Sequence, residues 1–456
     1  MRKMRVLALS LGTGALVLSF SSFVSPHLSM QEASIADLDR VQSEGVSSAN
    51  REVYAPDPNH IWNRLFRLFY VRRARNGDQY GGDELDPYLW EQSKYLLTGP
   101  SHDEALKFLD EFLQQHSEKL IRDPLRRAIF QRDLLAVYEW LSAPSDTQEP
   151  SRSELQQRIA EVIRRLALTD DEIGKLPDNY DDAIRARAFP VAYDPANPRE
   201  PFLAADLFDS AGPWVCLGEQ HGRPVASDHL AFFGGRSVFL VFFQVPGGRS
   251  NTLDYLAKLR DIPKGWGAES GVPGRSGPYP EPPQFPIGTR MALVRQLVLI
   301  DGHGHPIATH LTESVQIRVY RAIHFDLGGT GAHSQDFVEF TLSREGLFRG
   351  WSGGLRPIAP GDREFLFFRS QGIDAFEMEE DPRRSRAPVL ETCSDCHDAA
   401  GMHCFISYSR ERFGPNDVPP PKLIASTPSR ESATQIQWLK QHGKLAFADR
   451  VAKRVK

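Results

Sequence analysis

The sequence predicts an α+β protein in which an N-terminal helical bundle precedes an antiparallel-rich β domain and a short C-terminal C-x-x-C-H segment with a terminal helix. Three observations lead to this prediction. Helix start signals and helical spacing of apolar residues recur through residues 59–185. Strand-like runs replace them in residues 186–380. Residues 381–456 contain two closely spaced cysteines and then a final helical pattern.

The helical bundle is predicted from five start signals. Each combines a capping side chain with a proline or with a glutamate three residues later, which satisfies free amides at a helix N-terminus. In chain order they are Asp86–Pro87, Ser101–Glu104, Asp123–Pro124, Ser151–Glu154 and Thr169–Glu172. The first of these helices is expected to stop at Gly99–Pro100. The aromatic and histidine side chains of this region fall at helical spacing, which indicates packing rather than chemistry.

The β domain is predicted from apolar or alternating runs bounded by turn residues. In one run Val315, Ile317 and Val319 alternate with polar neighbours, which indicates a strand. A short helix is expected at 251–259 and a turn at Asp301–Gly302. The strand-like runs are residues 237–245, 291–301, 313–321, 336–342 and 364–370.

The N-terminus has the outline of an export signal. Arg2, Lys3 and Arg5 precede a mostly apolar run over residues 6–24. We predict residues 1–36 as a signal peptide, or as a membrane anchor because the run is long enough to span a bilayer. Residues 37–58 are predicted as a polar linker. The rest of the chain is therefore expected in the periplasm or cell envelope, with a membrane contacted only through such an anchor.

The overall charge argues against nucleic acid as a partner. The formal net charge is -5 over 456 residues, whereas a general nucleic-acid binder needs a basic surface that displaces counterions from phosphates. The glycine-rich stretches lack the strand-to-helix setting of a phosphate-binding loop, so they are predicted as turns. A chain of this length also buries enough apolar surface to fold without disulfides, so its four cysteines need a chemical explanation.

Cys393, Cys396 and His397 form a C-x-x-C-H sequence. Random placement of 4 Cys and 14 His in this chain gives roughly 0.001 expected matches to that spacing. Two cysteines three residues apart can present both sulfurs from one helical turn to the vinyl groups of a haem, and the next histidine can reach the iron. Haem attachment of this kind takes place outside the cytoplasm, in agreement with the predicted export signal.

Residues 387–410 resemble the haem-attachment segment of c-type cytochromes. The resemblance implies a covalent haem c, with Cys393 and Cys396 as thioether donors and His397 as the proximal iron ligand. It also implies periplasmic electron transfer or redox chemistry with a periplasmic redox partner. A late C-x-x-C-H after a sheet is similar to the β-sheet c-type cytochromes that bind or oxidise small nitrogen compounds.

The sixth iron ligand is not given by the motif. Small cytochromes of this family place a methionine several tens of residues after the motif, whereas here only Met402 follows, five residues on. The distal candidates are Met378, His333 and Met402, with Met291 and His324 also considered. If no protein side chain ligates the iron on that side, we predict a haem enzyme or gas sensor instead of an electron carrier.

Two readings without haem stay open for the same residues. Cys393 and Cys396 could form a disulfide, or could hold zinc together with His397, His403 and Cys404, since a tetrahedral ion accepts such ligands. Either reading predicts a cell-envelope binding or scaffold protein.

Other clusters give weaker signals. Cys216 and Cys404 could pair in an oxidising compartment. Arg383, Arg384 and Arg386 could meet haem propionates or form a solvated linker. The histidines at 303 and 305 could bind a metal or belong to a polar hairpin loop. Residues 219–229, which include His229, form a polar loop in this interpretation.

Overall fold

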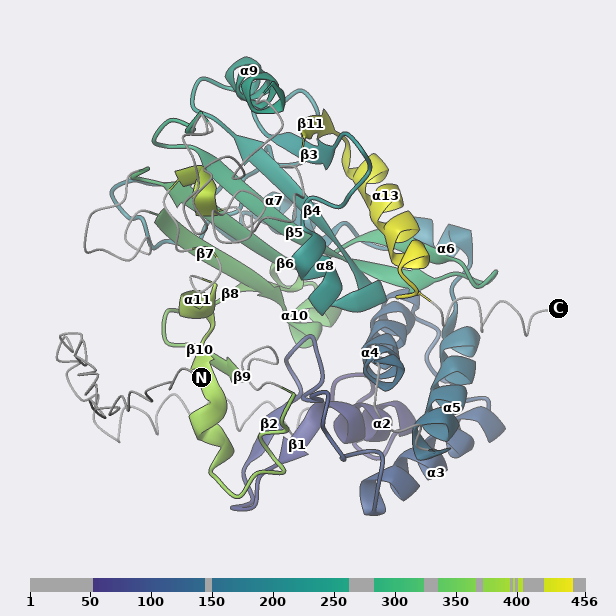
Figure 1. The fold of residues 1–456 in the computed structure, drawn as a ribbon. Helices are drawn as coiled ribbons and strands as arrows, with labels where there is room; N and C mark the ends of the chain where they lie inside the picture. The colour runs from purple at the N-terminus through teal and green to yellow at the C-terminus, as the bar shows by residue number, and fades with distance from the viewer. Residues whose placement is uncertain are drawn as a thin grey trace, which may run out of the picture. The chain divides into compact units, whose positions relative to one another are not determined.

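A seven-stranded antiparallel sheet forms the centre of the computed structural model (Figure 1). The structure describes residues 52–143, 150–261, 283–323, 335–365, 372–393, 397, 401–404 and 422–445. The strand order is β11-β3-β4-β5-β6-β7-β8, so six strands follow one another as a meander and the last strand adds to the β3 edge. The strands are β3 Val215–Glu219, β4 Ser237–Gln244, β5 Arg290–Ile300, β6 Pro306–Tyr320, β7 Gln335–Leu342, β8 Leu355–Pro357 and β11 Leu423–Ser426.

Two small hairpin-like sheets accompany the main sheet. β1 (Val71–Arg73) pairs with β2 (Gln79–Gly81), and β9 (Arg363–Phe365) pairs with β10 (Arg386–Pro388). Short 3-10 helices connect other elements: η1 Ser117–Lys119, η2 Gly234–Arg236, η4 Ser352–Gly354, η5 Pro382–Ser385 and η6 Gly401–Cys404.

The helices precede, interrupt and follow the sheet in the predicted order, which confirms the α+β class. Figure 1 shows α2 to α5 grouped beside one end of the sheet. None of the helices in the described ranges is long and apolar enough to cross a membrane. The helices are α2 Ile61–Tyr70, α3 Pro100–Gln114, α4 Pro124–Ser142, α5 Pro150–Leu166, α6 Asp170–Gly174, α7 Asn179–Arg185, α8 Ser227–Phe232, α9 Arg249–Arg260, α10 Arg344–Arg349, α11 Val389–Thr392 and α13 Pro428–Gln441.

Two of the predicted helix starts form the caps that the sequence indicates. The Asp123 side chain accepts a hydrogen bond from the Leu125 amide at 3.0 Å where α4 begins. Thr169 and Glu172 form a complete capping box at α6. At α3 the helix begins at Pro100 with Gly99 as N-cap and no side-chain cap. The capping box predicted at Ser101–Glu104 is therefore wrong, although the helix is present.

The helix predicted from Asp86–Pro87 to Gly99 is absent, so this prediction is wrong. The segment is irregular, and Leu96 has a positive φ of 65° that a helix cannot contain. The Asp86 carboxylate caps no helix, because it accepts hydrogen bonds from Arg132, Arg236 and Arg295 at 2.9 to 3.1 Å. The Asp86 side chain therefore binds arginines that are distant in the sequence instead of capping a helix.

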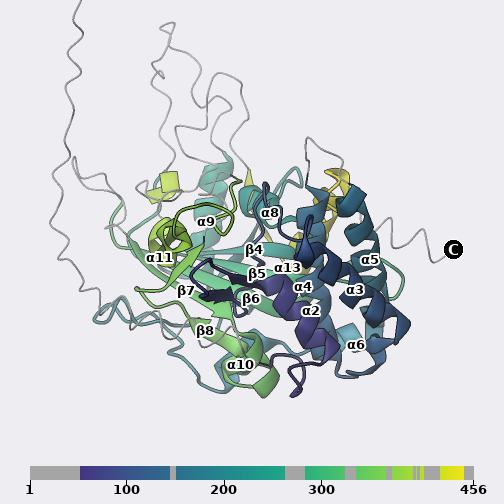
Figure 2. The same ribbon diagram turned by 90° about the horizontal axis from the view of Figure 1, so that it is seen from below.

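The two faces of the sheet have different surroundings. Val315, Ile317 and Val319 of β6 point into an apolar cluster together with Trp214 and the segment around Phe202. On the other face β6 presents Gln316, Arg318 and Tyr320, and these are paired across β7 with Glu339, Phe337 and Gln335. Figure 2 shows α8, α9 and α11 on one side of the sheet. Both faces are thus covered, and the second one contains polar side chains.

Side-chain amides complete the sheet where strand pairing stops. The Gln435 amide donates to Phe239 O at 2.6 Å and accepts from Phe239 N at 2.7 Å. β3 pairs with β4 only at Phe242 and Phe243, so Gln435 takes the place of a missing strand neighbour. Gln131 of α4 bonds the N–H and C=O of Ile300 in the same way. Helices α4 and α13 are thereby fixed to the sheet by buried polar contacts.

Buried ion pairs connect the helices to the sheet. Arg132 of α4 pairs with Glu313 of β6, and Arg344 of α10 pairs with Asp133 of α4 at 2.6 Å. Residues Glu44–Lys456 form one compact unit. The boundaries predicted between bundle, β domain and C-terminal segment stay predictions.

Candidate functional site

His397 lies on the polar face of the sheet, and both its ring and its backbone are held. Its Nδ1 is 2.8 Å from the carbonyl oxygen of Cys404, and its own carbonyl accepts a hydrogen bond from Gln335 Nε2 at 2.8 Å. With Nδ1–H donating to a carbonyl, the lone pair is on Nε2. Metal-ligating histidines are oriented in this way by a bond from the second ring nitrogen. The arrangement therefore suits His397 as a ligand through Nε2.

The structure brings His229 of α8 to His397. The two imidazole centroids are 6.1 Å apart and their planes differ by 15°. His229 also packs on the Phe239 ring of β4, at 5.6 Å between centroids. The sequence predicts a polar loop around His229, because nothing local distinguishes this residue from its neighbours, whereas the structure places it on α8. Only the tertiary fold shows the pairing.

Arg318 places a buried positive charge beside these two histidines. Its Nη1 donates to Gln335 Oε1 at 3.1 Å, and the guanidinium lies 4.5 Å from the Phe337 ring centre. The side chain is 6 % exposed, and no described residue accepts a hydrogen bond from Nη2. A buried donor without an acceptor is costly. This guanidinium therefore suits a negatively charged group at the site.

Burial and the Arg318 charge keep both imidazoles neutral. Burial, with Arg318 second, lowers the pKa of His397 to about 3. The same two causes lower the pKa of His229 to about 4. At neutral pH both rings therefore have an unprotonated nitrogen, which is the form that binds metal.

Cys393 follows α11 and faces the sheet next to Glu339. Its Sγ lies 3.9 Å from Glu339 Oε2 and 3.8 Å from Val389 O. Gln316 donates to the other carboxyl oxygen of Glu339 at 3.2 Å. Burial raises the pKa of Glu339 to about 7. Cys396 lies outside the described residues.

Glu339 gives the free energy of unfolding a pH dependence. The folded chain keeps a proton on this carboxyl that the unfolded chain loses above about pH 4.5. The stability that the retained proton contributes is therefore fully present below about pH 4.5, and it is lost as the pH rises through about 7. We expect Glu339→Gln to remove a slope of up to about 1.4 kcal/mol per pH unit in that window. Urea unfolding at pH 5, 6, 7 and 8 measures it, with exposed Glu380→Gln as control. Equal slopes for Glu339→Gln and wild type would contradict the assignment.

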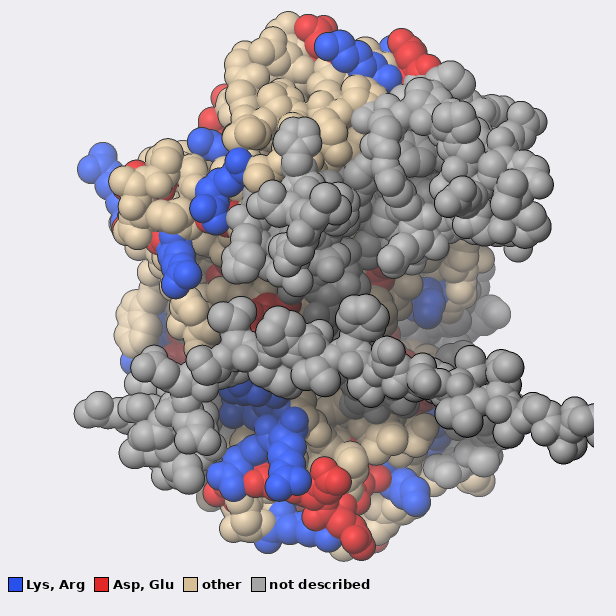
Figure 3. All heavy atoms as spheres, turned by 60° about the vertical axis from the view of Figure 1, so that its left-hand side comes forward, with Lys and Arg blue, Asp and Glu red and all other residues tan. Residues whose placement is uncertain are grey.

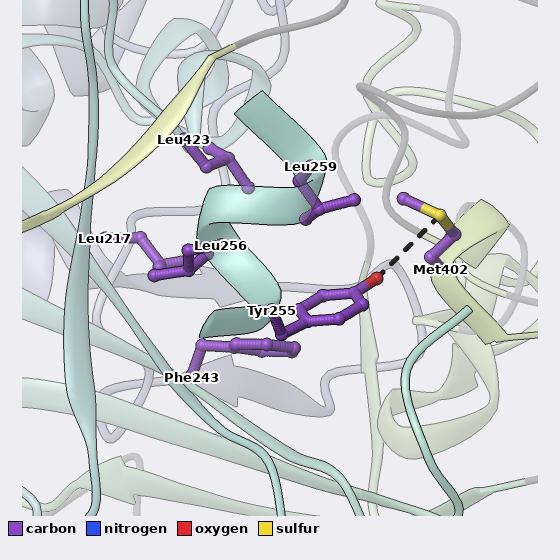
Figure 4. A pocket seen from close by; sticks show the side chains of 7 residues that line it. All are labelled: Leu217, Phe243, Tyr255, Leu256, Leu259, Met402 and Leu423. Atoms are coloured by element: carbon purple, nitrogen blue, oxygen red, sulfur yellow. Dashed lines mark hydrogen bonds between the residues drawn. The ribbon is translucent and has the colours of Figure 1, made fainter. Parts of the chain in front are cut away.

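The predicted distal methionines lie in different surroundings. Met402 is 1 % exposed and its Sδ lies 3.9 Å from the Tyr255 hydroxyl, which donates its proton to Pro283 O at 2.7 Å. Figure 4 shows it directed at Tyr255 beside a small apolar pocket formed by α9, β3, β4 and β11. Met378 belongs to a segment fixed elsewhere, because the neighbouring Glu377 accepts from the Lys94 and Tyr95 amides at 2.8 Å.

The remaining distal candidates are either outside the described residues or not in contact with His397. His333 and His324 lie outside the described residues. Met291 is the cross-strand neighbour of Arg318 on the polar face. No contact between Met291 and His397 is found in the described part of the chain.

A zinc site that includes Cys404 has little support from the described residues. The Cys404 thiol is buried and lies 2.8 Å from the Tyr320 hydroxyl. Within the described ranges no three His, Cys, Asp or Glu side chains form a group suited to a metal ion. The side chain of His403 is outside the described part, so a zinc site that uses it stays a prediction.

The suggested Cys216–Cys404 disulfide is wrong. Both cysteines are free thiols. Cys216 belongs to the apolar cluster on one face of the sheet, and Cys404 to the cluster on the other. The sheet itself separates the two sulfurs.

Two further clusters have structural partners. The Asp301 carboxylate accepts from the amides of His303 and His305 at 2.8 and 2.7 Å, as in a polar hairpin loop. Arg383 pairs with Asp381 at 2.6 Å. Figure 3 shows side chains of both charges next to one another at the lower end of the face it views.

The donor set on the polar face is suited to a haem. His397 offers a neutral nitrogen, Cys393 lies on the same covering segment, and Arg318 provides a cation for a propionate. Gln335 links two of these groups, because it bonds both His397 and Arg318. No family model, no curated protein and no solved structure matches this chain.

Proposed function

We propose that this chain is an exported c-type haem protein that transfers single electrons in the periplasm. Cys393 and Cys396 would hold the haem through thioether bonds, and His397 would ligate its iron. A bound haem supplies an iron that changes between ferric and ferrous states. One electron enters from a one-electron donor protein and leaves to a one-electron acceptor protein, and no bond of the chain forms or breaks.

The orientation of His397 is the observation that carries this proposal. The Nδ1 bond to Cys404 O fixes one ring nitrogen and leaves the other available. The depressed pKa keeps the ligand form present at every physiological pH.

Other residues at the site would affect the reduction potential of a bound haem. The positive charge of Arg318 would favour the ferrous over the ferric iron, because the reduced centre carries one positive charge less. Phe239 and Phe337 limit contact of the site with water. Burial of this kind contributes to the reduction potential of a haem.

Intact mass and a haemochrome spectrum test the proposal. We expect the chain, expressed with haem-ligation machinery, to gain roughly 616 Da, the mass of one thioether-linked haem, and to give a c-type pyridine haemochrome. The double variant Cys393→Ala/Cys396→Ala should lose the covalent mass. Cys216→Ala, outside the motif, should keep it. Wild-type protein that is colourless and has the plain peptide mass would reject the proposal.

A further inference from the structure

We infer that His229 is the sixth ligand of the iron, on the side opposite His397. This inference rests on the proposed function, and it assigns a residue that the C-x-x-C-H sequence does not indicate. It concerns two side chains from distant parts of the chain, one on α8 and one in the C-terminal segment.

The distance between the rings fits one shared metal ion. Two imidazoles that bind one ion from opposite sides have centroids roughly 6 Å apart, since each nitrogen lies about 2 Å from the metal. The observed centroid separation is 6.1 Å, with planes within 15° of parallel. Direct packing of the two rings also occurs near this separation. The experiment must therefore distinguish a ligand from a packed ring.

Each ring has a contact that limits its orientation. His397 is oriented by Cys404 O, and His229 packs on the Phe239 ring with 5.6 Å between the centroids. Supporting contacts of this kind fix the direction of a ligand.

The methionine alternatives have less support from the structure. Met402 contacts the Tyr255 hydroxyl at 3.9 Å inside an apolar cluster, and Met378 lies on the segment fixed to Lys94 and Tyr95. His229 has a ring nitrogen that can bind a metal, and its ring centroid lies 6.1 Å from that of His397. Ligation by His229 closes the iron to small molecules, which favours electron transfer over gas binding.

The test uses the full chain with attached haem and follows its optical and electron paramagnetic resonance spectra. We expect wild type to be low-spin in both oxidation states and unchanged by carbon monoxide. His229→Phe keeps a ring against Phe239 but has no ligating nitrogen, so it should become high-spin and bind carbon monoxide. His221→Phe, an exposed histidine on the preceding loop, is the matched control and should behave as wild type.

Two additional measurements guard against a folding defect. Added imidazole should return a His229→Gly variant to the low-spin form. His229→Met should stay low-spin with a raised midpoint potential, because a Met/His pair raises the potential of a c-type haem.

The outcomes separate the two proposals. A haem-containing wild type that is high-spin and binds carbon monoxide overturns the His229 assignment and leaves the haem proposal standing. A His229→Phe variant that stays low-spin does the same. A wild type without haem overturns both.

Discussion

Replacing Arg344 by methionine is expected to lower the free energy of unfolding by about 3–5 kcal/mol, the usual cost of breaking a buried ion pair. Arg344 and Asp133 are each about 2 % exposed and form two bonds, at 2.6 and 3.1 Å. Without the guanidinium, Asp133 would remain buried with only the Tyr54 hydroxyl, at 2.5 Å, as a described side-chain donor. Arg344 of α10 also donates to Glu84 O at 2.8 Å. The substitution therefore removes the contacts of α10 with α4 and with the segment at Glu84.

Urea unfolding of wild type and variant measures the Arg344 effect. Arg349→Met, which breaks the half-exposed Arg349–Glu345 pair of the same helix, should change stability by less than about 1 kcal/mol. Adding Asp133→Asn to Arg344→Met removes the unpaired charge and should recover part of the loss. Equal losses for Arg344→Met and Arg349→Met would show that the buried pair contributes no more to stability than the half-exposed pair.

Gly353→Ala is the second substitution with a large expected effect, a loss of roughly 3 kcal/mol or more. Gly353 has a φ of 61°, and a Cβ there would overlap the carbonyl oxygen of Asn179. The Asn179 side chain in turn bonds the N–H and C=O of Thr312, at 2.7 and 3.0 Å. A shift of Asn179 would therefore expose the buried backbone of Thr312 in β6.

Comparison with Gly350→Ala separates the cost of a positive φ from the cost of steric overlap with Asn179. Gly350 also has a positive φ, 70°, but no atom lies within 4 Å of its hypothetical Cβ. Its replacement should cost only the backbone strain, about 1 kcal/mol. Thermal or urea unfolding gives both values. If the two alanine variants are equally stable, contact with Asn179 does not explain the glycine at 353.

Local signals in the sequence predicted the α+β class and the strands β4 to β7, but not β3, β8 or β11. The β6 alternation follows directly from the period of a strand, and Pro or Asp at a helix start restricts the backbone locally. Such features depend on a few neighbouring residues. The Asp86 prediction failed for the opposite reason. Its carboxylate is held by arginines from α4, η2 and β5, and no local pattern could show that competition.

The candidate site could be predicted only in part. Cys393 and His397 come from a fixed spacing that covalent chemistry requires. Arg318 and Gln335 meet on the paired strands β6 and β7, whereas His229 of α8 and His397 of the C-terminal segment are brought to that face by the tertiary fold. Alternation predicted that Gln316 and Arg318 share a face, but it did not predict that this face is covered.

The placement of β11 has a consequence for maturation. β10 holds the chain just before Cys393, and β11 pairs with β3 after it, at the far edge of the sheet. β11 is also the last strand to be synthesised, so β3 to β8 can assemble while the C-terminal segment is still open. If haem is attached to Cys393 and Cys396 as proposed, both thiols must be accessible at that moment. Attachment would then have to precede the pairing of β11 with β3, and a chain that folded completely beforehand would stay without haem.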